Sequence, residues 1–148
     1  MRHSGISFVC LAAGLCAMPV IAQEARPNLS GKWQFNAGKS ELHSGKTNAI
    51  SLAIESKGST IHVTKTVTAN GKDSVVEYNC STDGADCDAK GAKVSLWFDG
   101  ASLVEMDVAG DAITKSSMKL APGGKAISVT VSYISPKADS DTLVLDKM

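Results

Sequence analysis

Residues 60–80 read TIHVTKTVTANGKDSVVEYNC, and this stretch indicates an antiparallel β-hairpin. Thr60–Ala69 and Ser74–Cys80 are rich in β-branched residues, which favour strands. Between them, Asn70-Gly71 is a strong hairpin signal, because both residue types tolerate the positive φ angles of a type I′ turn. The stretch therefore predicts two strands joined by a tight turn.

The same rhythm of short β-rich runs and turn signals continues on both sides of this hairpin. Gly and Pro fall in the turns, and helical periodicity is nowhere convincing after residue 23. We predict an all-β fold, an antiparallel up-and-down meander of 8–9 strands that closes into a barrel. The expected strands are Lys32–Phe35, Ile50–Ser56, Thr60–Ala69, Ser74–Cys80, Lys93–Phe98, Leu103–Val108, Ala112–Leu120, Ala126–Ser135 and Thr142–Lys147.

Alternation along the strands predicts which side chains point inward, because successive residues of a strand face opposite sides of the sheet. Lys65 is an unexpected charged member of an otherwise apolar stripe, and His62 falls on the outward face. The predicted inward stripes are Ile61, Val63, Lys65 and Val67; Val94, Leu96 and Phe98; Val104, Met106 and Val108, opposite Glu105 and Asp107; and Ile127, Val129, Val131 and Tyr133.

The N-terminal segment resembles a secretory signal peptide. A short basic start precedes an apolar run, Ile6–Ala17, which is too short to span a bilayer. Val20–Ala22 then offers the small-x-small pattern of a cleavage site. We expect a signal helix in residues 1–22, a flexible leader in 23–29 and one domain in 30–148, with the mature protein periplasmic or secreted and without a membrane span. An uncleaved anchor and lipidation at Cys16 are the alternatives.

Cys80 and Cys87 are the two cysteines that follow the predicted cleavage site. In an exported protein such a pair predicts a disulfide, with two free thiols as the alternative. The spacing does not fit a redox or metal motif.

The start of the domain, residues 28–36, reads NLSGKWQFN. Its Gly31-x-Trp33 element, at the entry to the first strand, resembles the lipocalin signature. The resemblance extends to a group of uncharacterised exported bacterial lipocalin-like β-barrel proteins, which begin with a DLSGTWxLNxxKS stretch matched here also by Asn36, Lys39 and Ser40. It implies a lipocalin-like barrel in which Trp33 plugs one end and a basic side chain packs across it.

The sequence excludes several classes of function. Fifteen Lys and Arg balance fifteen Asp and Glu, and no basic stripe suggests nucleic acid. His43 and His62 lack the motifs of a hydrolase or a zinc site, so we expect neither an enzyme nor a cofactor. Asp83, Asp86 and Asp88 could hold calcium, but their spacing is not that of an EF-hand, and Asp-Gly turns are common for backbone reasons, which favours a plain solvated hairpin. We therefore expect no metal.

Two functions remain. The first is binding of a small apolar ligand inside the barrel, whose candidate lining residues, equally suited to a plain core, are Leu96, Phe98, Met106, Val131 and Tyr133. The alternative is a secreted or envelope protein-interaction module with a filled core, which would use polar outer faces such as Thr60–Thr68 and Ser116–Lys119. In either case we expect a monomer.

Overall fold

The computed structural model describes residues 26–46 and 49–148. The predicted signal peptide, residues 1–22, lies outside these residues. The described chain forms β1 (Gly31–Phe35), the 3-10 turn η1 (Ala37–Lys39), β2 (Ala49–Lys57), β3 (Thr60–Ala69), β4 (Lys72–Ser81), β5 (Asp83–Ala89), β6 (Ala92–Asp99), β7 (Ser102–Ala109), β8 (Ala112–Leu120), β9 (Ala126–Ser135) and β10 (Ala138–Lys147).

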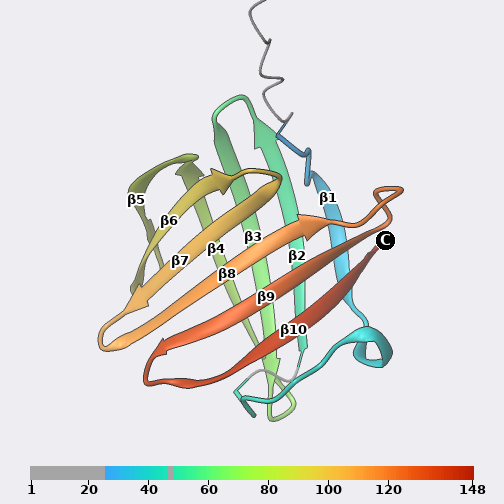
Figure 1. Ribbon diagram of the computed structural model, residues 1–148. Coiled ribbons are helices and arrows are strands. Elements are labelled where there is room, and N and C mark those ends of the chain that lie inside the picture. The colour runs from blue at the N-terminus through green and yellow to red at the C-terminus, as the bar shows by residue number, and fades with distance from the viewer. Residues whose placement is uncertain (1–25, 47–48) are drawn as a thin grey trace, which may run out of the picture.

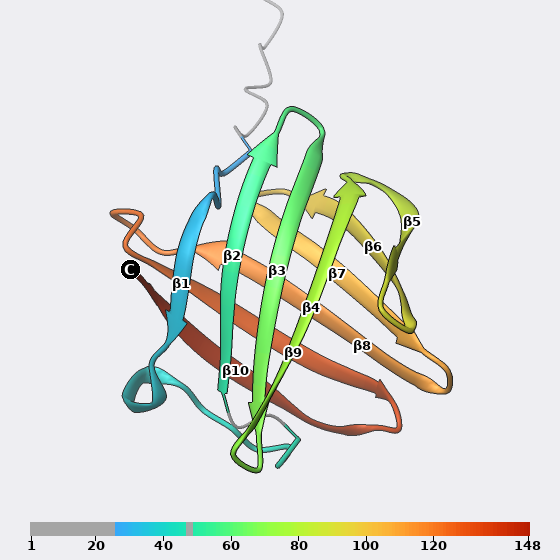
Figure 2. The same ribbon diagram turned by 180° about the vertical axis from the view of Figure 1, so that it is seen from behind.

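All ten strands belong to one antiparallel sheet that curls into a nearly closed barrel (Figures 1 and 2). Each strand pairs with its neighbour in the sequence except at one place, and β1 also pairs with β10, which joins the first and last strands. The exception is the seam between β4 and β5, the two edges of the sheet. The predicted all-β meander is thus confirmed.

The predicted hairpin around Asn70-Gly71 is present. Asn70 has φ 53° and Gly71 has φ 72°, so both residues adopt the left-handed conformation that a type I′ turn needs. Ala69 pairs with Lys72 directly across this turn, and the register continues without a break along both strands.

The strand that the sequence did not predict is β5. Its residues include three Asp and one Gly, which strands usually avoid. Pairing with β6 overrides this low propensity, and a register shift between Asp83 and Asp86 accommodates the Asp-Gly step as an irregularity.

The barrel interior follows the predicted alternation on β3, β6 and β9, but β7 is reversed. Leu96 on β6 is fully buried inside and pairs with Glu105, so alternation turns Glu105 and Asp107 inward. Met106 and Val108 therefore lie on the outer face, and Val104 points to the same side but is 2% exposed, outside the main core cluster. The prediction was wrong because it assigned the apolar side of β7 to the core. Lys65 and Tyr78, from other strands, instead contact the inward-facing carboxyl groups.

Candidate functional site: a hollow end of the barrel

One end of the barrel, where the chain enters β1, is filled by Trp33. The Trp33 side chain is 1% exposed, and its Nε1 donates a hydrogen bond to the Leu29 carbonyl at 2.9 Å. The Lys147 ammonium lies 5.5 Å from the centroid of the Trp33 ring, a cation–π contact. Gly31 adopts a φ of 143°, and a Cβ there would meet the Lys147 stem at 3.1 Å, so this approach requires glycine.

The core extends beyond the predicted start of the domain at residue 30. Leu29 is 1% exposed and belongs to the main hydrophobic cluster. Arg26 stacks over the Phe98 ring at 5.2 Å. The described part of the predicted leader, residues 26–29, is therefore packed against the barrel.

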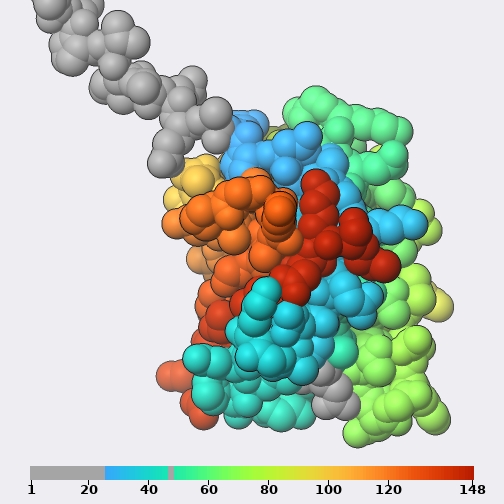
Figure 3. Space-filling view, turned by 90° about the vertical axis from the view of Figure 1, so that its right-hand side faces the viewer, coloured from blue at the N-terminus to red at the C-terminus, as the bar shows by residue number. Residues whose placement is uncertain are grey.

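The Asn-x-x-Lys-Ser segment after β1 ties the following loop to β10. Asn36 Nδ2 and Lys39 Nζ contact the Asp146 carboxylate at 2.6 and 3.1 Å. Ser40 Oγ accepts a hydrogen bond from the Val144 amide at 2.8 Å. Figure 3 shows this part of the chain (cyan) on the surface beside the C-terminal strand (red). These contacts explain the Asn-x-x-Lys-Ser motif as an anchor that holds the loop after β1 to β10.

The opposite end of the barrel is hollow. A cavity of about 350 Å³ opens where the β3–β4, β5–β6 and β7–β8 turns gather. Its walls combine apolar and polar side chains from most of the strands: Ile50, Lys65, Val67, Val76, Tyr78, Ala89, Lys90, Ala92, Asp107, Ala109, Thr114, Ser116, Val131, Tyr133 and Leu143.

A charged cluster forms part of the cavity wall. Lys65 Nζ on β3 contacts Glu105 Oε1 and lies 3.2 Å from Asp107 Oδ2, both on β7. The Tyr78 hydroxyl on β4 donates a hydrogen bond to Glu105 Oε2. In the sheet, β7 is a neighbour of neither β3 nor β4, so Lys65 and Tyr78 meet the β7 carboxylates across the interior.

The cluster shifts the protonation of its own members. Burial alone would raise the pKa of Glu105, but the Lys65 ammonium and several hydrogen bonds hold it below its usual value. Burial and the Glu105 charge together raise the pKa of Asp107 to about 6. Burial opposes the charge of Lys65, yet the two carboxylates raise its pKa. At pH 7 the ionised cluster therefore holds two carboxylates against one ammonium.

A second polar anchor, Asp141, holds the wall beside the cavity. Its fully buried carboxylate accepts a hydrogen bond from the Tyr133 hydroxyl at 2.8 Å and others from the main-chain amides of His43 and Ser44 at 2.7 and 2.8 Å. Lys46 lies 5.8 Å from the Tyr133 ring centroid. Asp141 thus fixes the orientation of Tyr133 and fastens the 41–46 loop to the barrel.

The predicted ligand-lining residues separate into three groups. Val131 and Tyr133 line the cavity. Leu96 is fully buried, and Phe98 packs beside Arg26 towards the filled end. Met106 pairs with Ser95 and Lys115 on the outer face and does not line the cavity, a consequence of the reversed face of β7.

Sequence reasoning missed the charged residues of the site and the tyrosine bonded to them: Lys65, Glu105, Asp107 and Tyr78. Two signals pointed to them. Lys65 stood in an apolar stripe, and Glu105 and Asp107 occupied one face of a strand together. Connecting these signals requires knowing that β3 and β7 face each other across the barrel.

The Cys80–Cys87 disulfide bridges the β4–β5 seam, where the described strands lack ladder pairing. The neighbouring Asp83, Asp86 and Asp88 each contact a different partner: Ser81, Ser95 and Lys93. Within residues 26–46 and 49–148, no three metal-binding side chains converge, and no helix is long and apolar enough to cross a membrane.

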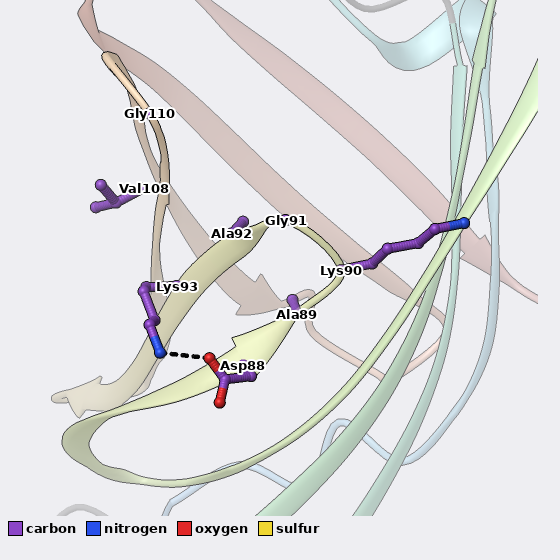
Figure 4. Close-up of a pocket in the computed structure, with 8 residues that line it drawn as sticks. All are labelled: Asp88, Ala89, Lys90, Gly91, Ala92, Lys93, Val108 and Gly110. Carbon is purple, nitrogen blue, oxygen red and sulfur yellow. Dashed lines mark hydrogen bonds and ion pairs between the residues drawn. The ribbon is translucent and has the colours of Figure 1, made fainter.

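A second hollow lies outside the barrel, between the β5–β6 turn and β7 (Figure 4). Ala89, Gly91, Ala92 and Gly110 form much of its surface, and its charged pair, Asp88 with Lys93, is mutually satisfied. Figure 4 shows the Lys90 side chain pointing away from this pair. The internal cavity, with its converging polar groups, is therefore the better candidate site.

Comparison with known proteins identifies the fold. No protein-family model matches the chain, and no curated protein matches it. Among solved structures, wild-type fluorescent protein UnaG aligns with a TM-score of 0.59 and 15% identity over 80% of this chain and 96% of its own. A point mutant of UnaG aligns with a TM-score of 0.57 and 16% identity over 80% and 94%. At this identity the likeness establishes a shared lipocalin-like barrel fold.

Proposed function

We propose that this protein binds a small amphiphilic molecule inside the hollow end of its barrel. The observation that carries the proposal is the coexistence of an internal cavity of about 350 Å³ with converging polar side chains on its wall. Cavities of about 300–1,000 Å³ that are mainly apolar, with a few placed polar groups, are typical of small-molecule sites.

Two features of the cavity support a ligand with both an apolar and a polar part. Val67, Val76 and Val131 offer apolar contact, which favours transfer of a hydrocarbon part from water. Asp107 and Lys65 offer hydrogen bonds to a polar group. The structural likeness to UnaG supports a barrel of this type but does not name a ligand.

We also propose that the protein acts outside the cytoplasm after removal of residues 1–22. The signal-like N-terminus and the Cys80–Cys87 disulfide support this, since disulfides persist in oxidising compartments. Expression of the full chain in a bacterial host, followed by intact-mass measurement of the periplasmic fraction, tests it. A mature form beginning at Gln23 is expected, and an uncleaved chain in the cytoplasm would contradict it.

Ligand binding can be tested with N-phenyl-1-naphthylamine, an uncharged fluorescent probe. Saturable enhancement of its emission by the folded protein is expected. Val131→Trp, which fills the cavity, should abolish the enhancement, whereas Val108→Trp, on the outer face, should leave it unchanged. Trp97 pairs with Asp83 and Val104 and faces outward, so its fluorescence is a poor reporter of the cavity.

The controls decide between the two functions. Thermal unfolding of both Trp variants establishes that each is folded. No saturable binding by the wild-type protein would contradict the ligand-binding proposal and leave the interaction module with a filled core as the better account.

A further inference from the structure

We infer that the cavity selects ligands carrying a cationic amine, which pairs with Asp107 beside the Lys65–Glu105 ion pair. This inference rests on the proposed function and names the chemical class of its ligand. Its basis is the position and the charge balance of the cluster that lines the cavity.

Asp107 is the carboxylate that a ligand can reach. The Glu105 side chain is 1% exposed, and its two oxygens already accept from Lys65 and Tyr78. The Asp107 side chain is 26% exposed and lines the cavity. Lys65 also lines the cavity, but its side chain is 15% exposed and already contacts both carboxylates, so Asp107 is the more exposed charge of the cluster.

The charge of the cluster distinguishes among ligands. One ammonium and two ionised carboxylates leave a net negative charge beside an apolar cavity, where charges interact more strongly than in water. A ligand carboxylate would approach Lys65 only by also approaching two like charges. A ligand ammonium would instead complete a second ion pair with Asp107.

The other cations near the cavity are at its rim. Lys90 is an exposed residue of the β5–β6 turn, and Lys46, also exposed, lies 5.8 Å from the Tyr133 ring centroid. Water and salt screen such exposed charges. Tyr78 and Tyr133 also line the cavity, but Lys65 lies 5.6 Å from the Tyr78 ring centroid and Lys46 lies 5.8 Å from that of Tyr133, so these rings already contact cations.

The selection should depend on pH because of the groups that face Asp107. Lys65 and Glu105 stay charged near neutrality, and burial with the Glu105 charge raises the pKa of Tyr78, which stays neutral. Hydrogen bonds from Ser44 and Tyr133 outweigh burial and lower the pKa of Asp141, so it stays ionised. Asp107, with its pKa raised to about 6, is then the group that loses its charge on mild acidification.

The experiment compares three eight-carbon ligands that differ in the head group: n-octylamine, n-octanol and octanoate. Each displaces N-phenyl-1-naphthylamine from the wild-type protein at pH 7.5. Octylamine should bind about tenfold more tightly than octanol, since a hydrogen bond to a charged group contributes more than a neutral one. Octanoate should bind most weakly.

Two further measurements keep the test decisive. Asp107→Asn should remove the preference for octylamine over octanol, while Asp88→Asn, an exposed carboxylate outside the barrel, should retain it. If Asp107→Asn does not fold, titration of the wild-type protein from pH 7.5 to pH 5 replaces it, with octylamine affinity falling and octanol affinity steady.

The outcomes separate this inference from the proposed function. Tighter binding of octanoate, or equal binding of all three ligands, would overturn the amine selectivity while leaving the cavity as a binding site. Failure of the probe itself to bind would overturn the proposed function.

Discussion

The two ends of this barrel follow the same alternation of inward and outward residues but have opposite contents. At the filled end, Trp33 and Leu29 are each 1% exposed, and the single polar atom of the Trp33 ring is hydrogen-bonded. At the hollow end, Lys65, Glu105 and Asp107 occupy inward positions and a cavity remains. A strand pattern thus determines which residues face inward but not whether they fill the space.

The difference indicates that the two ends of the barrel have different roles. The filled end buries large apolar side chains and supplies stability through area removed from water. The hollow end holds charged groups whose desolvation is costly unless they are paired. Groups with strongly shifted pKa values cluster at functional sites, which agrees with the proposed site.

Removing Trp33 should break the filled end and have the largest effect on stability. We expect Trp33→Ala to lower the free energy of unfolding by about 3–5 kcal/mol, since it leaves a large cavity in a packed core. Urea unfolding measures the change. Val75→Ala is the matched control, because Val75 is 55% exposed and its loss should change the free energy by about 0.5 kcal/mol or less. Similar losses for both variants would contradict a special role of the filled end.

Disrupting the charged cluster should have the next largest effect on the free energy of unfolding. Glu105→Ala leaves the Lys65 ammonium and the Tyr78 hydroxyl without their buried acceptor, and we expect a loss of about 3 kcal/mol. The double variant Lys65→Met with Glu105→Leu removes both charges and should recover most of that loss. Urea unfolding of the two variants tests this. Equal destabilisation of both would show that the pairing of charges is not the cause.

Removing the disulfide across the β4–β5 seam should have an intermediate effect on the free energy of unfolding. Replacing both Cys80 and Cys87 by Ser should lower the free energy of unfolding by about 2–3 kcal/mol on the chain-entropy model for a short loop. Chemical denaturation of the variant and the oxidised wild-type protein measures it. An unchanged midpoint would mean that side-chain packing alone holds the seam.

Neutralising Asp107 should have the smallest effect on the free energy of unfolding, and it should raise that free energy where the other variants lower it. The pKa of about 6 in the folded protein exceeds the unfolded value of about 3.9, so wild-type stability from this group falls as pH rises from about 4 to 6. Asp107→Asn should therefore be more stable than wild type at pH 7.5, by on the order of 2 kcal/mol, and the difference should shrink towards pH 4. Thermal unfolding across this range measures it, with Asp88→Asn as the control. A variant less stable at pH 7.5 would contradict the assigned shift.

Most of the fold could be predicted from the sequence because the local signals agree with the tertiary structure. Asn70 and Gly71 form the tight turn that their backbone preferences predict, and the stripe from Ile127 to Tyr133 faces the interior. β5 escaped prediction because pairing with β6, a non-local interaction, overrides the low strand propensity of its Asp and Gly residues.

The site was less predictable because its residues come together across the barrel. Val131 and Tyr133 were identified from their stripe alone. Met106 was assigned inward on its apolar character, although the register with Leu96 turns Glu105 inward instead. Nothing local in the sequence indicates that Lys65 on β3 compensates carboxylates on β7.

The most direct test of a filled end and a hollow, ligand-binding end is amide and indole chemical-shift mapping of the labelled protein during titration with n-octylamine. We predict saturable shifts at Val131, Tyr133 and Asp107, with the Trp33 indole signal unchanged. Shifts confined to the outer face around Met106 and Val108, or centred on Trp33, would contradict the account.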